Sequence, residues 1–100
     1  MKRIEHLLQV LQEEAAEVIQ AASKINRFGL RDFNPFTGEN NEDKLVAEIH
    51  DLLAILQMVN EELHLGVGEG REAEEAVESK KRKVNCYIDE YAKPRGTLDE

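Results

Sequence analysis

Apolar residues recur at every third or fourth position along three long stretches of the chain, which is the spacing of one face of an α-helix. This pattern predicts helices over residues 2–27, 41–65 and 71–92. No stretch alternates apolar and polar residues in the way that a half-buried strand does. The sequence therefore predicts an all-α fold.

Breaks in the pattern coincide with residues that typically end or begin helices. Gly29 in "RFGL" suits the position just past a last helical turn, and Asn41 is suited to cap the helix that follows. Pro35 and Gly38 indicate a polar loop between these two helices. The third helix must end before Pro94.

The second helix is apolar around most of its circumference, as "KLVAEIHDLLAIL" over residues 44–56 shows. Long helices joined by short turns pack antiparallel, so we expect an antiparallel bundle of three long helices. It forms a single domain over residues 1–93, followed by a loose tail over residues 94–100. Three helices do not cover so wide an apolar surface, so we expect homo-oligomerisation, as a homodimer or homotetramer, to complete the bundle.

The composition narrows the range of partners. The chain has 100 residues, of which 41% are hydrophobic and 34% are charged, and its formal charge is −8. That charge disfavours nucleic acid polymers and anionic membranes as partners, and no apolar run is long enough to span a bilayer. Cys86 is a lone cysteine, which excludes an internal disulfide and fits a reducing compartment. Because no secretory signal is visible, we expect a cytoplasmic protein.

Two pairs of acids interrupt the apolar pattern of the first two helices. Glu14 and Glu17 are spaced i, i+3, as are Glu48 and Asp51, so each pair lies on one side of its helix. If the two helices are antiparallel neighbours, four carboxylates meet, and their mutual repulsion requires cations. Oxygen ligands favour hard ions, so we expect Mg²⁺, with Mn²⁺ as a substitute. The alternative is a solvated helix face, most readily for Glu14 and Glu17.

A basic residue lies in an otherwise apolar row of the third helix. Lys80 is the one charged member of that row, and Lys83 lies on its flank. A lysine directed at a carboxylate cluster forms either a buried ion pair or a contact with a phosphate. The residues alone leave both alternatives open.

The acidic pairs also fit the pattern of a known family. "EEAAE" followed by "EIHD" resembles the EExxE…ExxD signature of the MazG-like, all-α nucleoside triphosphate pyrophosphohydrolases. "ASKINRFGL" and the Asn-rich entry to "LVAEIHDLLAIL" are similar to small, phage-type members of that family. The resemblance covers residues 4–65 and is looser over the third helix.

The resemblance implies a hydrolase that depends on Mg²⁺. It would convert a nucleoside triphosphate, which we expect to be a deoxynucleotide, to a nucleoside monophosphate and pyrophosphate. Glu14 and Glu17 match the acids of ExxE, and Glu48 and Asp51 match those of ExxD. These four residues are therefore the expected metal ligands and catalytic acids.

A triphosphate substrate also needs cations and a surface for its base. Lys80 and Lys83, together with Lys24 or Arg27, are the residues expected to contact its phosphates. Three aromatic residues are candidates for stacking on the base, although core packing is the more common role for each of them: Phe28, Phe33 and Phe36.

Two other functions fit parts of the sequence. A non-catalytic helical oligomeric interaction module would use its acids in ion pairs with Lys80, Lys83 or a partner. A di-iron carboxylate bundle would need Glu-x-x-His pairs, a spacing that Glu61 and His64 have. These two residues point away from the Glu48 side of their helix, so they do not join that site.

Overall fold

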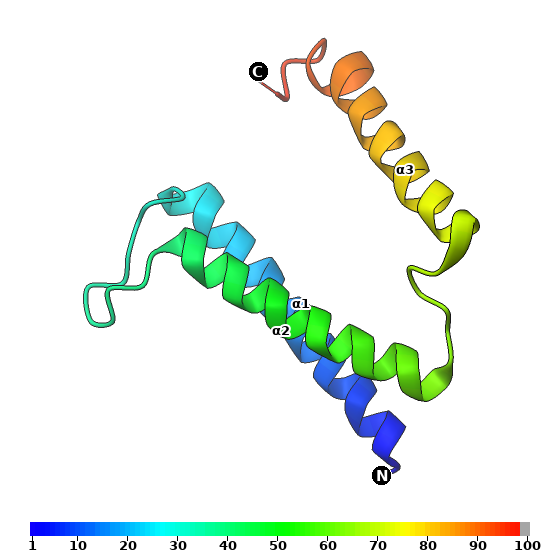
Figure 1. The fold of residues 1–100 in the computed structure, drawn as a ribbon. Helices are drawn as coiled ribbons and strands as arrows, with labels where there is room; N and C mark the ends of the chain where they lie inside the picture. The colour runs from blue at the N-terminus through cyan, green and yellow to red at the C-terminus, as the bar shows by residue number, and fades with distance from the viewer. Residues whose placement is uncertain (99–100) are drawn as a thin grey trace. The chain divides into compact units, whose positions relative to one another are not determined.

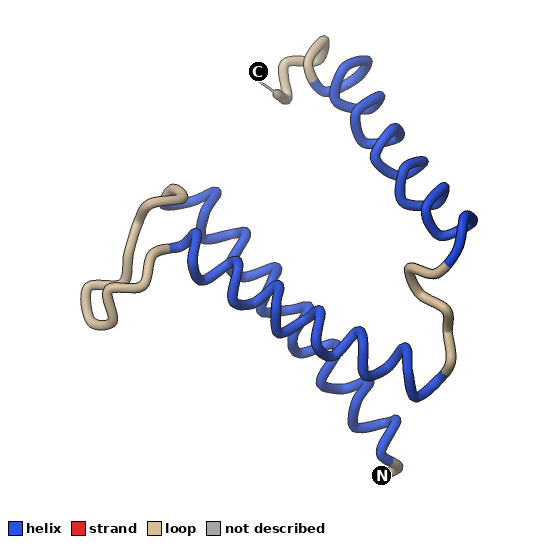
Figure 2. Tube along the Cα trace, viewed as in Figure 1, coloured by secondary structure: helices blue, strands red, loops and turns tan. Residues whose placement is uncertain are grey.

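The computed structural model describes residues 1–98, in which three α-helices are followed by a short π-helix. The elements are α1 (Arg3–Phe28), α2 (Asn41–Leu63), α3 (Gly70–Tyr87) and the π-helix η1 (Ile88–Ala92). Figures 1 and 2 show these helices and the loops that join them. No strand forms within the described residues, where the β contacts amount to an isolated bridge between Phe33 and Asn40. The prediction of an all-α fold is confirmed.

The helices begin and end within two residues of the predicted positions, except at the end of the third. There the helix predicted to reach residue 92 changes to π-helix, and the Lys93 N–H donates to the Ile88 carbonyl oxygen at 3.0 Å. The cap predicted for α2 was wrong by one residue. Asn40 is the cap, and its side-chain oxygen accepts a hydrogen bond of 2.8 Å from the Asp43 N–H.

The chain divides into two compact units, one over residues 1–65 and one that starts at Gly66. The first unit is an antiparallel hairpin of α1 and α2, which lie side by side (Figure 1). At one end Arg3 Nε contacts Glu62 Oε1 at 2.7 Å. At the other end Asn41 Nδ2 donates to the Gly29 carbonyl oxygen at 2.9 Å. The three-helix bundle and the single domain over residues 1–93 stay predictions.

The hairpin has a thin apolar core. Leu7, Ala21 and Val59 are its buried apolar side chains, because two helices cover only one stripe of each other. Many large apolar side chains remain exposed on it, among them Leu8, Ile19, Val46, Ile49, Leu53, Leu56 and Met58. Even so, no helix within residues 1–98 combines the length and apolar character that crossing a membrane requires.

The loop between α1 and α2 is a folded turn with hydrogen bonds of its own. The Asn34 N–H donates to the Glu39 carbonyl oxygen at 2.9 Å, and the Gly38 N–H donates to the Asn34 carbonyl oxygen at 2.7 Å. Asn34 Oδ1 accepts a further bond of 2.8 Å from the Phe36 N–H. Gly38 has a φ of +78°, which a residue with a β-carbon adopts only with strain. The turn therefore has a defined shape at this end of the hairpin.

The second unit consists of α3, η1 and a terminal turn. Among its described apolar side chains, Ala92 is buried, whereas Val77 and Val84 are about half exposed. Tyr87 and Tyr91 stack on each other with their ring centroids 5.9 Å apart. The apolar side of α3 is therefore uncovered within its own unit.

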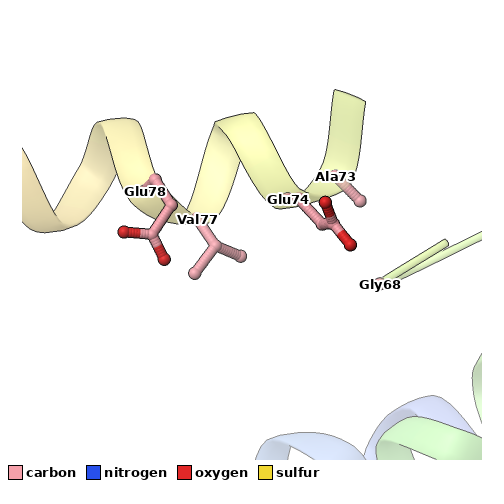
Figure 3. A pocket seen from close by; sticks show the side chains of 5 residues that line it. All are labelled: Gly68, Ala73, Glu74, Val77 and Glu78. Atoms are coloured by element: carbon pink, nitrogen blue, oxygen red, sulfur yellow. The ribbon is translucent and has the colours of Figure 1, made fainter. Parts of the chain in front are cut away.

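A shallow hollow of about 310 Å³ lies beside the first turns of α3. Figure 3 shows Val77 between the side chains of Glu74 and Glu78 on the same side of the helix. The hollow carries two acids and no basic or metal-ligating partner among its lining residues. It therefore has no constellation that indicates chemistry.

The C-terminal tail, predicted to be loose, forms a hydrogen-bonded turn in its described part. The backbone N–H and the hydroxyl of Thr97 both donate to the Ala92 carbonyl oxygen at 3.0 Å. The Arg95 guanidinium lies 5.3 Å from the centre of the Tyr91 ring. Residues 99 and 100 of the predicted tail lie outside the described residues.

Candidate metal centre on the helical hairpin

The antiparallel packing of α1 and α2 brings three carboxylates together near the middle of the hairpin. Glu14 and Glu17 come from adjacent turns of α1, and Glu48 comes from α2. One carboxylate oxygen from each lies within 4.8 Å of the others. Within residues 1–98 this is the one group of three or more side chains able to share a metal ion.

Glu48 is the most deeply placed member of this group, with 3% of the residue exposed. Its Oε1 contacts Nζ of Lys44, one turn earlier on the same helix, at 2.7 Å. Its Oε2 is buried and accepts no hydrogen bond. Oε2 of Glu14 is also buried without a hydrogen-bond partner. The lysine therefore neutralises part of the group and leaves two carboxylate oxygens unpaired.

The pKa values of Glu17 and Glu48 shift in opposite directions. Hydrogen bonding to Glu48, followed by the negative charges of Glu48 and Glu14, raises the pKa of Glu17 above its usual value of 4.5. The hydrogen bond from Lys44 is the largest of the causes that lower the pKa of Glu48. The same bond raises the pKa of the Lys44 ammonium. Glu48 is therefore held ionised, and Glu17 takes up a proton more readily than Glu48 does.

The donor set fits a hard divalent cation. Burying a polar oxygen without a partner is costly, and this applies to Oε2 of both Glu14 and Glu48. All three side chains offer oxygen, the ligand that Mg²⁺ and Mn²⁺ prefer. Glu14, Glu17 and Glu48 would hold such an ion, and water or phosphate oxygens would complete its coordination, since Mg²⁺ usually retains several such ligands.

Asp51 is not part of this group. It is exposed on α2, and its position three residues after Glu48 turns it by about 60° around the helix axis from the side that faces α1. The structure therefore brings together three of the four acids expected as ligands. A role for Asp51 as a ligand stays a prediction.

Two of the basic residues expected to bind phosphate, Lys24 and Arg27, lie near the loop end of the hairpin, and the other two lie on α3. Lys24 is exposed on α1 and lines a pocket at the loop end of the hairpin. The Arg27 guanidinium lies 5.1 Å from the centre of the Phe28 ring. Lys80 and Lys83 are exposed on α3, in the second unit, and their contact with the acids stays a prediction.

Lys44 is the residue of the site that the sequence analysis missed. Its signal was the i, i+4 spacing to Glu48, which places the two side chains next to each other on a helix. This pair lies within one helical turn, so it requires no assumption about tertiary structure.

The di-iron alternative receives no support from the hairpin. Glu61 and His64 lie at the C-terminal end of α2, roughly 20 Å along the helix from Glu48 at a rise of 1.5 Å per residue. His64 is the C-cap residue, with a φ of +52°. The carboxylate group itself contains no histidine.

The chain was compared with protein-family models, with curated proteins and with solved structures. None of the three comparisons gives a match. The features that bear on function are therefore the carboxylate group of the hairpin and the EExxE…ExxD pattern.

Proposed function

We propose that the protein is a MazG-like nucleoside triphosphate pyrophosphohydrolase that depends on Mg²⁺ and acts on a deoxynucleotide. The observation that carries this proposal is the group of Glu14, Glu17 and Glu48, with two buried carboxylate oxygens that lack partners. Such a group fits a cation that in turn binds phosphate. The EExxE…ExxD signature supplies the reaction class, and three of its five acids, Glu14, Glu17 and Glu48, are the three that meet.

The proposed reaction adds water across the anhydride between the α- and β-phosphates and releases a nucleoside monophosphate and pyrophosphate. Bound Mg²⁺ would supply an acidified water and neutralise charge on the phosphoryl oxygens. Glu14 and Glu48, each with a buried oxygen that has no hydrogen-bond partner, would hold the ion together with Glu17, and Lys44 keeps Glu48 ionised. A carboxylate oxygen of this group that does not hold the ion would accept the proton of the attacking water.

Association of several copies is part of this proposal. The hairpin and α3 each leave apolar side chains exposed within their own units, and a completed bundle would cover them. We propose a homodimer or homotetramer in which helices from more than one copy form the bundle. Lys80 and Lys83 would then supply cations to the triphosphate.

The test is the release of pyrophosphate from a panel of canonical and modified deoxynucleoside triphosphates in the presence of Mg²⁺. We expect turnover of at least one nucleotide. Glu48→Gln and Glu17→Gln should each reduce kcat by about a hundredfold or more while the helical circular dichroism signal is retained. Glu61→Gln is the matched control, because it neutralises an exposed acid of α2 outside the carboxylate group.

No pyrophosphate from any nucleotide, in a preparation shown to bind Mg²⁺, would refute the proposal. Equal activity of Glu48→Gln and Glu61→Gln would show that the carboxylate group is not the site. Either result can be obtained with the full chain.

A non-catalytic interaction module is the second candidate, and one observation favours it. The 2.7 Å contact between Lys44 and Glu48 already gives the most buried acid a partner. A structural ion pair of this kind needs no metal, so this function predicts a melting temperature that does not respond to Mg²⁺ or Mn²⁺ with nucleotide. The hydrolase predicts a rise in the melting temperature, because a ligand that binds only the folded state stabilises it.

A further inference from the structure

All three phenylalanines of the chain lie at the loop end of the hairpin, and none of them is buried. Phe28 is 60% exposed, Phe33 is 59% exposed and Phe36 is 95% exposed. The prediction that these rings pack in the core was therefore wrong. A chain with a thin core that leaves its largest apolar rings in solvent at one location indicates a binding surface.

The three rings line one pocket of about 300 Å³ at the point where α1 ends and α2 begins. The folded turn holds two of them, since Asn34 Oδ1 fixes the backbone at Phe36 and a β-bridge joins Phe33 to Asn40. The Arg27 guanidinium lies over the Phe28 ring at 5.1 Å. The aromatic lining is therefore presented by a structured loop and the last turn of a helix.

Polar side chains complete the lining and are partly committed to the fold. Asn41 uses Nδ2 to bond the Gly29 carbonyl oxygen, and Asn34 uses Oδ1 to accept from the Phe36 N–H. The side-chain oxygen of Asn41 can therefore still accept a hydrogen bond from a ligand, and the side-chain nitrogen of Asn34 can still donate one. Lys24 and Asp32 also line the pocket, and their opposite charges leave its lining without net charge, although the whole chain carries −8.

The pocket continues the helix row that carries the acids. Glu17, Ala21, Lys24 and Phe28 follow one another at spacings of four, three and four residues on α1, so they lie on one side of the helix. At 1.5 Å per residue, Lys24 lies roughly 10 Å beyond Glu17 along the helix axis, and Phe28 lies roughly 16 Å beyond it. Along this row an acid is followed by a cation and then by an aromatic ring. A nucleoside triphosphate has a matching order: phosphates that bind metal, then a further phosphate or the sugar, and then the base.

We propose that this pocket binds the base of the nucleotide, which stacks on Phe28 or Phe33 while the amides of Asn34 and Asn41 bond to its polar edge. This inference rests on the proposed function, because it places the base of the same substrate whose phosphates meet the carboxylates. Every base has a face that stacks on an aromatic ring, and one such contact substantially strengthens binding. Lys24 lies between the two sites and contacts the phosphates.

The experiment compares the full-length protein with Phe28→Ala, Phe33→Ala and the control Ile19→Ala. Ile19 is 68% exposed on α1 and does not line the pocket, so its variant also removes an exposed apolar side chain. Two quantities are measured. One is the steady-state hydrolysis of deoxynucleoside triphosphates and of inorganic triphosphate, and the other is calorimetric binding of deoxynucleoside monophosphates without divalent cations.

We expect both phenylalanine variants to weaken binding of the preferred monophosphate by roughly 5- to 100-fold, the range for loss of one base–aromatic stack. KM for its triphosphate should rise by a similar factor, while kcat and any hydrolysis of inorganic triphosphate stay within about twofold. Ile19→Ala should match the wild type. Sedimentation of all variants should be unchanged, because the rings contact nucleotide and not another copy.

Two results would overturn the inference. One is nucleotide binding by both phenylalanine variants that equals that of the wild type. The other is a change of sedimentation with no change in nucleotide binding, which would make the pocket a contact between copies. Failure of the proposed hydrolysis is a separate result, since base binding is measured without a metal and without turnover.

Discussion

Glu48 lies next to one positively charged side chain and two further carboxylates. On one side, the Lys44 ammonium at 2.7 Å stabilises its ionised form. On the other side, Glu17 and Glu14 add negative charge to the same small volume. Three carboxylates thus face one ammonium, and hydrogen bonding to Glu48, followed by the negative charges of Glu48 and Glu14, raises the pKa of Glu17. A cation would remove the imbalance without disturbing the Lys44–Glu48 pair.

Removal of the lysine tests this account. Lys44→Met should lower the melting temperature of the metal-free protein by roughly 4–8 °C, since Glu48 loses its charged partner while it stays buried. Mg²⁺ should then raise the melting temperature of the variant more than that of the wild type. Lys81→Met is the control, because Lys81 forms an exposed pair with Glu78 at 3.1 Å, and such pairs contribute little. Equal effects of the two substitutions, measured by thermal circular dichroism, would contradict the account.

The raised pKa of Glu17 predicts a particular dependence of stability on pH. Because the folded state binds this proton more tightly than the unfolded state, its contribution is complete below pH 4.5 and is lost as pH rises through the raised pKa. Glu48 acts in the opposite sense, since its lowered pKa gives stability above pH 4.5 that is lost as pH falls below it. A decline of stability that begins just above pH 4.5 therefore belongs to Glu17, because the other groups with raised pKa values, Cys86 and Lys44, titrate at much higher pH.

Urea unfolding in EDTA, repeated across this pH range for the wild type and Glu17→Gln, measures the effect. The wild type should lose stability with rising pH, and the variant, which has no such proton, should not show that component. Mg²⁺ should abolish the decline, because it binds the ionised carboxylate. A decline of equal size in the variant would assign the proton to another group.

At the scale of helices and loops, features that depend on a single helix were predicted well from the sequence, and features that depend on how two helices pack were predicted less well. Except at the end of α3, the 3–4 spacing of apolar residues set the helix bounds to within two residues, because that spacing depends on one helix at a time. The meeting of Glu14 and Glu17 with Glu48 was predictable once two antiparallel helices were assumed. The exposure of Asp51 was not, because the spacing fixes its angle to Glu48 but not which of the two residues α2 turns toward α1.

Three other features could not be predicted from the sequence: the cap of α2, the π-helix and the exposure of the phenylalanines. Asn40 and Asn41 are both good caps, and the choice between them depends on the loop that delivers the chain to α2. The change from α- to π-helix at Ile88 leaves no apolar spacing that marks it. The three phenylalanines resemble core residues by type, and only the folded turn shows that they are exposed.

The cap of α2 gives a prediction at this scale. Asn40→Ala removes the 2.8 Å bond from the Asp43 N–H and should lower the free energy of unfolding by about 1 kcal/mol, the usual effect of losing such a cap. Asn26→Ala is the control, because Asn26 is exposed inside α1, where alanine is the better helix former. Chemical denaturation of both variants measures the difference. A loss in the control as large as that in Asn40→Ala would show that the cap contributes nothing.

At the scale of the whole molecule, a small core is combined with a large amount of exposed apolar surface. The buried apolar residues within the described chain are Leu7, Ala21, Val59 and Ala92, whereas small domains need most of their apolar surface buried to be stable. The charge of −8 opposes nonspecific clustering of such surfaces. A specific, symmetric association of copies satisfies both conditions, and it makes stability depend on protein concentration.

Leu53 offers a direct test of that association, since it is 46% exposed on α2. In a lone hairpin, Leu53→Lys would change a surface residue and alter stability little. In a homodimer or homotetramer it would place a charge in an apolar interface, so the sedimenting mass should fall toward the 11.4 kDa of one chain. The melting temperature should fall with it and lose its dependence on protein concentration.

Ser23→Lys adds the same charge at an exposed polar position of α1 and should leave both the mass and the melting temperature unchanged. Analytical ultracentrifugation at micromolar concentrations, with thermal melts over a hundredfold range of concentration, separates the two cases. A wild type that sediments as one chain throughout, with a melting temperature independent of concentration, would require that the apolar faces be covered within a single copy. The carboxylate group would then have to bind its cation and substrate with the residues of one chain.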